Sequence, residues 1–334
     1  MTETMRALVW EGPRAMSLRE IAVPVTEDGD VLIEVAHAGI CGSELSGYLG
    51  QSSLRSPPLV MGHELAGTVA HVGGGVEAVK VGDRVTVNPL VSCGRCDRCA
   101  EGRHHLCPQR ALIGAHRPGA FAQFVAAPEA NVHPLPDDLG LAAAALTEPL
   151  ACAVHACRLA EVAAGQRLAI IGAGPIGLLA LVTARLLGVE EVVVSDTNED
   201  RLEVARDLGA APEGAADLTP GSFDIVVDAV GVDVTRAQCV ELARPGGTVA
   251  FCGLHEEDSP LPVNLVVRNE LMLRGSFAYA PKDFEHALGW MGEGRVDLSA
   301  WIWHADLSEG RACFEKLLGD PGGTIKIMLD PSPA

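Results

Sequence analysis

The chain is short of basic residues. Among its 334 residues only 25 are Lys or Arg, against 44 Asp or Glu, so its formal net charge is −19. A surface this negative repels phosphate backbones and anionic lipid. The imbalance argues against nucleic acid and membranes as partners.

Long uninterrupted apolar runs are also missing. The most apolar stretch, residues 167–188, is broken by Gly, Pro and Arg and is no membrane-length span. The first 20 residues lack the apolar run of a signal peptide, so a cytoplasmic location is expected. In that reducing compartment the ten cysteines are expected as thiols or metal ligands rather than disulfides.

Aromatic residues are scarce, at 4%, and no internal repeat or low-complexity tract occurs. What is present, 48% hydrophobic and 21% charged residues, is typical of globular proteins, and the length predicts about two domains. Up to about residue 150, short apolar runs cut by Gly and Pro predict a β-rich domain.

From residue 151 to 280 the pattern changes to an alternation of strands and helices, which predicts an α/β domain with a parallel sheet. Strands are expected at 167–172, 191–196, 223–231, 246–253 and 271–277, and helices at 146–165, 175–188, 198–209 and 233–244. Beyond about residue 281 the pattern is mixed, with helices expected at 281–292 and 308–319 and a strand at 324–330.

A glycine-rich turn, "GAGPIG", joins the first strand and helix of this alternation. It contains Gly172, Gly174, Pro175, Ile176 and Gly177. The three glycines allow a tight turn, close approach of a pyrophosphate, and close helix–strand packing. A glycine-rich turn without a ligand is the alternative, but the flanking strand and helix favour a dinucleotide site.

The cofactor preference follows from Asp196, which ends the next strand, 24 residues after Gly172. A carboxylate there accepts hydrogen bonds from a ribose diol and repels a 2′-phosphate. The next basic residue is Arg201. The sequence therefore predicts NAD rather than NADP, with Asp196 and Arg201 among the cofactor-binding residues.

Four cysteines, Cys93, Cys96, Cys99 and Cys107, have the spacing C-x2-C-x2-C-x7-C. Four thiolates close a tetrahedral zinc shell and leave no position for substrate, so a structural zinc is predicted. An iron–sulfur cluster, which also uses thiolates, is the main alternative, and unrelated free thiols are another.

Further motifs follow one another along the chain: "GICGSE", "GHELAGTV", "GDRV", the four-cysteine lobe, "TEPLA", "GAGPIG", "DAVG" and "RGSFAY". In this order and over essentially the full length, the chain resembles the zinc-dependent medium-chain alcohol dehydrogenases. The resemblance implies a GroES-like catalytic domain at 1–150, to which 281–334 return, and a Rossmann domain at 151–280. It also implies an active site between them.

The resemblance further implies a catalytic zinc bound by Cys41 and His63, with Glu64, Glu148 or a water completing its shell. Two zinc ions per chain are then expected. Ser43 is expected to take the proton of the substrate hydroxyl, although the histidine that often continues this relay is replaced here by Ser46.

The expected reaction is the transfer of a hydride from a secondary alcohol to NAD⁺. Glu148 stands where ethanol-type relatives carry cysteine and polyol-type relatives carry glutamate, so a polyol, sugar or cyclitol is the expected substrate. An amino alcohol, such as threonine or an aminocyclitol, is an alternative, since Glu44, Glu64 and Glu148 could bind an ammonium group. A non-catalytic zinc- and nucleotide-binding sensor is another.

Two further expectations concern the surroundings of the site. Tyr48 and Tyr279 are candidates either for the wall of a substrate pocket or for core packing. Family members associate through edge strands of the Rossmann sheet, so a homodimer or homotetramer is expected, with 246–253 and 271–277 as candidate edges.

Overall fold

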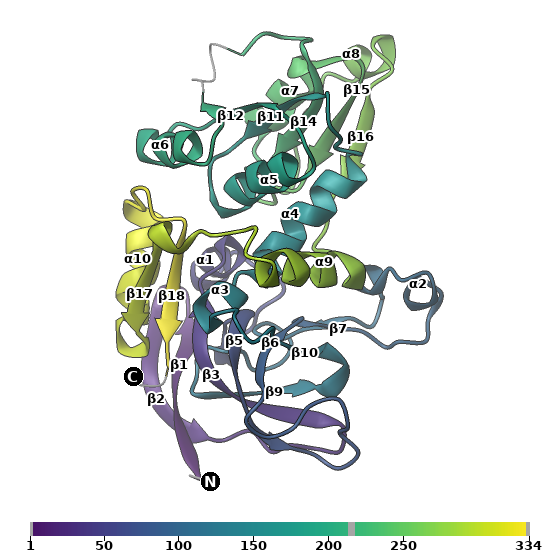
Figure 1. Cartoon of the computed structure of the whole chain (residues 1–334). Coiled ribbons are helices and arrows are strands. Elements are labelled where there is room, and N and C mark those ends of the chain that lie inside the picture. The colour runs from purple at the N-terminus through teal and green to yellow at the C-terminus, as the bar shows by residue number, and fades with distance from the viewer. Residues whose placement is uncertain (1–2, 213–217, 332–334) are drawn as a thin grey trace. The chain divides into compact units, whose positions relative to one another are not determined.

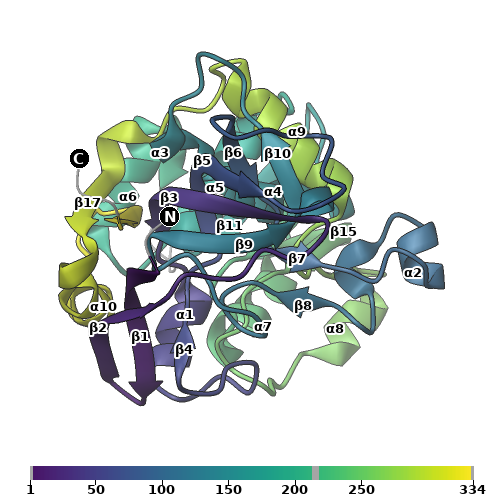
Figure 2. The same cartoon turned by 90° about the horizontal axis from the view of Figure 1, so that it is seen from below.

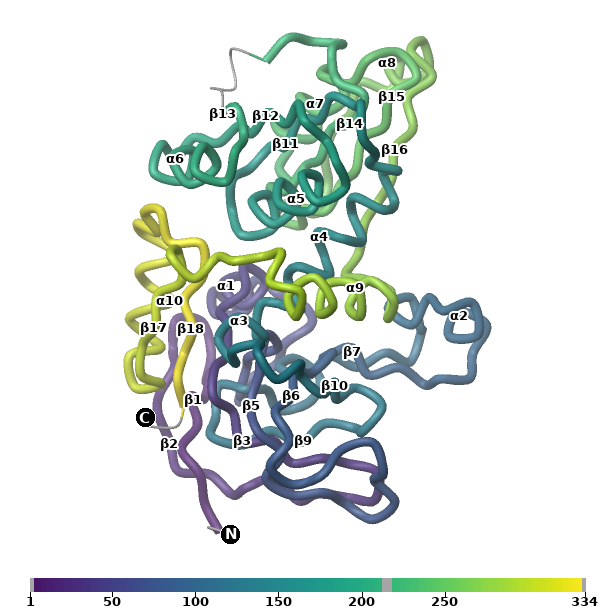
Figure 3. The backbone as a smooth tube through the Cα atoms, in the orientation of Figure 1, coloured from purple at the N-terminus to yellow at the C-terminus, as the bar shows by residue number. Residues whose placement is uncertain are grey.

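The chain forms two compact units, shown in Figure 1. The computed structural model describes residues 3–212 and 218–331. Unit 1 comprises Met1–Glu148 and Ala280–Ala334, and unit 2 comprises Pro149–Tyr279. Figure 3 shows the chain leaving unit 1 through α4 (Thr147–Leu159) and returning to it after β16 (Met272–Gly275).

Unit 2 is built on a six-stranded parallel sheet with the strand order β13-β12-β11-β14-β15-β16. Its other strands are β11 (Arg167–Ile171), β12 (Glu191–Ser195), β13 (Ala211–Pro212), β14 (Phe223–Asp228) and β15 (Ala243–Phe251). Counted along the chain this order is 3-2-1-4-5-6, the doubly wound arrangement that binds dinucleotides where the order reverses. The predicted α/β fold with a parallel sheet is confirmed.

The crossover helices of unit 2 are α5 (Pro175–Leu186), α6 (Glu199–Asp207) and α7 (Asp233–Leu242), with a shorter α8 (Val263–Arg268) before the last strand. The first four residues after Arg167 in β11 are all buried, as expected for a strand covered by helices on both faces. Helix α8 was not predicted, because its six residues span less than two turns and carry no strong start signal.

Unit 1 is β-rich, as the sequence predicts. A seven-stranded sheet has the path β10-β6-β5-β3-β18-β17, with β9 also paired to β3, and a smaller sheet has the order β2-β1-β4. The strands are β1 (Thr4–Gly12), β2 (Ala15–Ala22), β3 (Asp30–Gly39), β4 (Leu59–Val60), β5 (Glu64–Val72), β6 (Arg84–Val87), β9 (Phe124–Pro128), β10 (Val132–Pro134), β17 (Ile302–Asp306) and β18 (Lys326–Asp330).

Four helices accompany these strands: α1 (Gly42–Tyr48), α3 (Leu141–Ala144), α9 (Pro281–Gly292) and α10 (Gly310–Gly319). The predicted helix at 281–292 and strand at 324–330 are present as α9 and β18. Strand β17 was not predicted, since its five residues gain their strand character from parallel pairing with β18. The final segment of the chain is therefore part of the main sheet of unit 1.

The four-cysteine stretch forms a separate lobe of unit 1. It lies between the paired strands β7 (Leu90–Val91) and β8 (Ala111–Leu112) and contains the short helix α2 (Asp97–Ala100). In Figures 1 and 2 this lobe extends away from the sheets of unit 1. It has no place in the main core, so its own interactions must hold it together.

Both tyrosine candidates are core residues rather than parts of an open wall. Tyr48 is completely buried, and its hydroxyl lies 2.7 Å from Glu315 Oε1 and 3.1 Å from the Arg14 carbonyl oxygen. Tyr279 is 1% exposed. Within the part of the chain that the structure describes, no helix has the length and apolarity needed to cross a membrane.

Candidate functional site

Three potential metal ligands meet at the start of α1 and of β5. Cys41 is the N-cap residue of α1, His63 lies just before β5, and Glu64 is the first residue of β5. One ligand atom from each lies within 4.8 Å of the other two. A thiolate, an imidazole and a carboxylate at this separation are a donor set suited to zinc, with a further position left for water or substrate.

Glu44 fixes the two loops that carry these ligands. Its Oε2 accepts a hydrogen bond from the Cys41 N–H at 3.0 Å, and its Oε1 accepts from the Gly62 N–H and lies 2.8 Å from His63 Nδ1. Since Nδ1–H donates to this carboxylate, Nε2 is the nitrogen left to face a metal, the arrangement usual for ligating histidines. The residues present therefore fit a zinc ion.

The charges around Glu44 keep it ionised and favour positive charge at His63, which a proton or a metal ion at Nε2 can supply. Burial raises the pKa of Glu44, but the neighbouring His63 and Arg55 charges outweigh it and hold the pKa below its ordinary value. Burial lowers the pKa of His63, but the Glu44 charge and then the Cys41 charge raise it well above its ordinary value. Glu44 is thus a carboxylate that attracts positive charge onto His63.

A buried lysine holds Glu64. Lys326 Nζ lies 2.8 and 2.7 Å from the two Glu64 oxygens and donates to the Ile40 carbonyl oxygen at 3.1 Å. Burial lowers the pKa of Lys326, but the charges of Glu64, Cys41 and Glu148 raise it above its ordinary value, so it stays protonated. A Cβ on Gly39 would lie 2.2 Å from Glu64 Oε2, so only glycine leaves room for this carboxylate.

Glu148 differs from Glu64 in its position. It lies in the first turn of α4, is 7% exposed, and acts on the charge of Lys326, but it is outside the group formed by Cys41, His63 and Glu64. The sequence leaves Glu64 and Glu148 as equal candidates for the carboxylate that completes the catalytic zinc shell. In this structure Glu64 is the carboxylate beside the other two ligands.

Ser43 lies exposed beside this group. Its Oγ is 3.5 Å from Cys41 Sγ, and Arg55 donates to the Ser43 carbonyl oxygen at 2.9 Å and to Oγ at 3.4 Å. Ser43 does not cap α1, because Cys41 is the N-cap residue of this helix. The Ser43 hydroxyl therefore accepts from Arg55 and donates to Cys41 Sγ, and these two partners hold it beside the cysteine.

Sequence reasoning missed Arg55 and Lys326, and it did not assign Glu44 its role. Arg55 is 4% exposed and Lys326 is 2% exposed. Lys326 left a signal in the sequence, because a lysine within the apolar run "TIKIML" must find a buried partner. Arg55 stands in a proline-rich loop, where the sequence offers no comparable signal.

The four cysteine sulfurs of the lobe surround one point. Their separations are 3.5 Å for Cys93 and Cys107, 3.6 Å for Cys96 and Cys99, and 3.9 Å for Cys93–Cys99 and Cys96–Cys107. A tetrahedron with Zn–S bonds of about 2.3 Å has edges of about 3.8 Å. These distances favour a single ion over an iron–sulfur cluster, whose inorganic core would hold the sulfurs farther apart.

The glycine-rich turn of unit 2 has the geometry of a dinucleotide loop. Gly172 has φ +100°, and Gly174 is the N-cap of α5, followed by Pro175 at the first helical position and by Ile176. A Cβ on Gly177 would lie 1.8 Å from the Gly172 carbonyl oxygen, so the helix can pack here only with glycine. The start of α5 thus presents free N–H groups and a positive dipole end to phosphates.

Asp196 is held beside this turn. Its Oδ2 accepts from the Ala173 N–H at 2.6 Å, and its Oδ1 accepts from the Asn198 N–H at 2.9 Å. Two backbone donors orient the carboxylate and leave further lone pairs for a ribose. Arg201 Nη1 lies 4.0 Å from the position of a Cβ on Gly174, so the guanidinium reaches the same turn.

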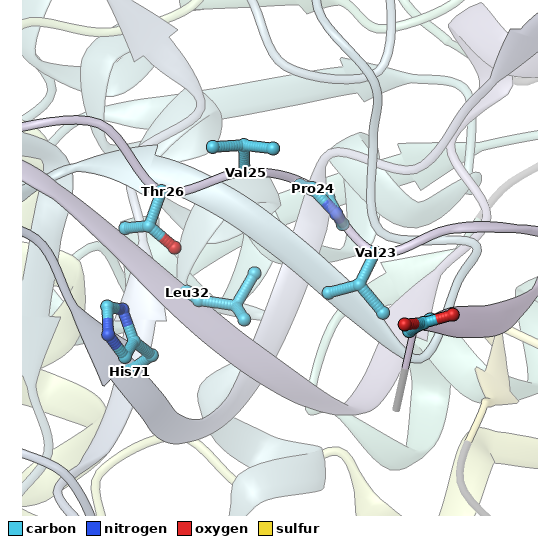
Figure 4. Close-up of a pocket in the computed structure, with 7 residues that line it drawn as sticks. Val23, Pro24, Val25, Thr26, Leu32 and His71 are labelled. Atoms are coloured by element: carbon cyan, nitrogen blue, oxygen red, sulfur yellow. The ribbon is translucent and has the colours of Figure 1, made fainter. Parts of the chain in front are cut away.

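A hollow on unit 1 lies elsewhere. Figure 4 shows its lining, which comes from the segment between β2 and β3, from β3 and from β5. It has a volume of about 270 Å³ and includes Leu32 and His71, and its rim residue Val25 is 85% exposed. None of the metal or dinucleotide residues described above lines it, so it has no part in this chemistry.

Known proteins share this combination of domains. A family model described as "Alcohol dehydrogenase GroES-like domain" matches residues 27–137, and one described as "Zinc-binding dehydrogenase" matches residues 175–293. The chain is 34% identical to the probable D-xylulose reductase A of Arthroderma otae, over 97% of this chain and 96% of that protein. It is 32% identical to the sorbitol dehydrogenase of Bacillus subtilis, over 99% of this chain and 98% of that protein.

Solved structures agree with this assignment. An alcohol dehydrogenase from Escherichia coli in complex with NADH has a TM-score of 0.92 at 28% identity, covering 98% of this chain and 100% of that chain. A zinc-binding dehydrogenase from Sinorhizobium meliloti bound to NADP has a TM-score of 0.91 at 31% identity, covering 99% and 100%.

Fold, site and comparisons define a dehydrogenase with a GroES-like domain and a Rossmann domain that uses zinc and a nicotinamide dinucleotide. The chain belongs to the zinc-dependent medium-chain alcohol dehydrogenase family and is an oxidoreductase.

The role of Glu44 can be tested with Glu44→Gln. The amide keeps the shape but cannot accept from all three donors, so we expect zinc at the Cys41–His63 group to bind about 10- to 100-fold more weakly. Competition with a chelator, followed by metal analysis, measures this. The exposed Glu34→Gln on β3 is the control. Equal zinc retention in both variants would contradict the proposed role.

Proposed function

We propose that this enzyme oxidises a secondary alcohol of a polyol, sugar or cyclitol and transfers the hydride to NAD⁺. The observation that carries the proposal is the mixed group of Cys41, His63 and Glu64, in which a carboxylate joins the softer ligands. Such a site is harder and more polar than one rich in thiolates, which suits a substrate with several hydroxyl groups. Relatives named sorbitol dehydrogenase and D-xylulose reductase support this substrate class.

The amino-alcohol alternative has less support from the geometry. It needs carboxylates that are free to bind an ammonium group. Glu44 already accepts from Cys41, Gly62 and His63, and Glu64 is paired with Lys326. An ammonium substrate would have to compete with these buried partners, at a cost in desolvation.

The proposed roles of the residues follow from their contacts. Cys41 and His63 hold the catalytic zinc, with Glu64 or a water completing the shell and Glu148 close to Lys326. When bound, the zinc would supply a Lewis acid that lowers the pKa of an alcohol, and the nicotinamide would supply the hydride acceptor. Ser43 relays the hydroxyl proton, accepting it as it releases its own proton to water, and Arg55 keeps its Oγ beside Cys41.

In unit 2 the proposed roles concern the cofactor. The N–H groups at the start of α5, between Gly174 and Gly177, bind the pyrophosphate. Asp196 accepts from the adenosine ribose, and Arg201 adds a positive charge near the same turn. The four-cysteine lobe holds the second zinc, which is structural.

A substrate panel with the purified enzyme tests the proposal. Sorbitol, xylitol and myo-inositol represent the proposed class, and L-threonine and ethanol represent the alternatives. We expect NADH formation, followed by its absorbance, to be fastest with a member of the first group. Turnover of amino alcohols alone would overturn the polyol assignment.

Cys41→Ser and Cys93→Ser separate the catalytic zinc from the structural zinc. In Cys41→Ser we expect loss of turnover and of one zinc per chain, with the melting temperature changed by only a few degrees. In Cys93→Ser we expect the main effect to be a lower melting temperature, because the lobe has lost the ion that closes it. Unchanged activity in Cys41→Ser, or a single non-exchangeable zinc in the parent enzyme, would instead favour a sensor.

Asp196→Ala tests the preference for NAD. Loss of the carboxylate removes the repulsion of a 2′-phosphate, so we expect the ratio of kcat/KM for NAD⁺ to that for NADP⁺ to fall by about 10-fold or more. Asp196→Asn, which keeps the shape but not the charge, serves as the matched variant and should change in the same direction. If both variants keep the parent ratio, another residue sets the preference.

We also propose a homodimer formed through the edge of the unit 2 sheet. Strand β16 is the edge strand, and β15 (which includes most of 246–253) is interior, so only the second of the two candidate edges is available. Met272 and Leu273 are 41% and 37% exposed, and Val263 and Val267 of α8 are 61% and 69% exposed. An exposed apolar edge of this kind favours pairing, and light scattering gives the mass. None of the ten cysteines, all within the described residues, is in a disulfide, which supports a reducing, cytoplasmic location.

A further inference from the structure

A second group of metal-ligand side chains lies on the main sheet of unit 1, apart from both zinc groups. Strand β18 lies between β3 and β17, and His37, Asp330 and His304 come from these three strands. Leu329 pairs with Ala38, which places Asp330 opposite His37. Figure 1 shows β17 and β18 side by side at the end of the chain. None of the three residues has a part in the proposed reaction.

The two imidazoles share one carboxylate. His37 Nδ1 lies 2.7 Å from Asp330 Oδ1, and His304 Nδ1 lies 3.1 Å from Oδ2 and 3.3 Å from Oδ1. The histidine rings meet edge to face, with centroids 5.1 Å apart. One ligand atom from each residue lies within 4.8 Å of the other two.

These separations suit a coordination shell. With bonds of about 2.1 Å to nitrogen and oxygen, ligand atoms around one ion lie about 3.0 Å apart in an octahedron and about 3.4 Å apart in a tetrahedron. The His304–Asp330 distances of 3.1 and 3.3 Å lie within this range, and the His37–Asp330 distance of 2.7 Å is shorter. An ion requires a small widening of the His37–Asp330 contact and the release of the Nδ1 protons that now donate to the carboxylate.

The surroundings admit an ion from solvent. The side chains of His37, Asp330 and His304 are 24%, 31% and 41% exposed. Asp306 pairs in register with Asp330 and adds negative charge. The nearby cation, Arg6, lies 3.6 Å from Asp306 Oδ2 and donates to the Pro331 carbonyl oxygen.

We propose that His37, His304 and Asp330 form a third metal site, which binds a borderline divalent ion such as Zn²⁺ or Ni²⁺. Two imidazoles and one carboxylate are the ligands that such ions favour, and water completes the shell at this partly exposed position. The ion would link β17 and β18 to β3. It would stabilise the contact between Asp330 and His37, which are 293 positions apart in the sequence.

The test uses the full-length enzyme with both zinc groups filled. Ni²⁺ is titrated by calorimetry, and the number of bound ions is checked by metal analysis after dialysis. We expect one further ion per chain with a micromolar Kd, and a rise in melting temperature on its addition.

Two variants locate the ion. In His304→Ala, which removes the most exposed ligand, and in Asp330→Asn, we expect Ni²⁺ to bind at least 10-fold more weakly. The exposed His286→Ala on α9 is the matched control and should bind like the parent enzyme. Absence of a further ion in the parent, or equal binding in His304→Ala and His286→Ala, would overturn the proposal. Because the readout is metal binding, the result is independent of the substrate assignment.

Discussion

The candidate catalytic site depends on one buried carboxylate. Glu44 accepts hydrogen bonds from the Cys41 N–H, the Gly62 N–H and His63, and it is completely buried. Removing one partner from a buried, charged network costs several kcal/mol, on the order of 3–5, because the remaining charge is left unpaired. The loop before α1 and the loop before β5 are therefore held as one unit, and the Cys41 thiol and His63 Nε2 are oriented before any metal arrives.

A second buried charge extends this arrangement to the end of the chain. Lys326 on β18 pairs with Glu64 from 262 positions away in the sequence and also donates to the Ile40 carbonyl oxygen. Glu64 is consequently held near Cys41 by a fixed cation, which both orients it and competes with a metal for its lone pairs. A carboxylate has about four lone-pair sites, so it can serve a lysine and a metal together. This balance suits a ligand that exchanges with water.

The two units contribute different chemistry to the same reaction. Unit 2 offers a helix N-terminus and an oriented Asp196, groups suited to phosphates and a ribose that need no metal. Unit 1 offers the metal group, with Ser43 and Arg55 beside it. The cysteine lobe lies outside the sheets of unit 1, so an ion that closes its four thiols replaces the hydrophobic core that so short a segment lacks.

Features that depend on neighbouring residues could be predicted from the sequence. The alternation of strands and helices, the glycine turn at 172–177 and the spacing of the four cysteines are local patterns, and local patterns constrain backbone geometry directly. Folding was needed to bring Glu64 rather than Glu148 beside Cys41 and His63, to pair Glu64 with Lys326, and to make β17 a strand. Those outcomes join residues far apart in the chain, and their register is set by strand pairing, which no local pattern specifies.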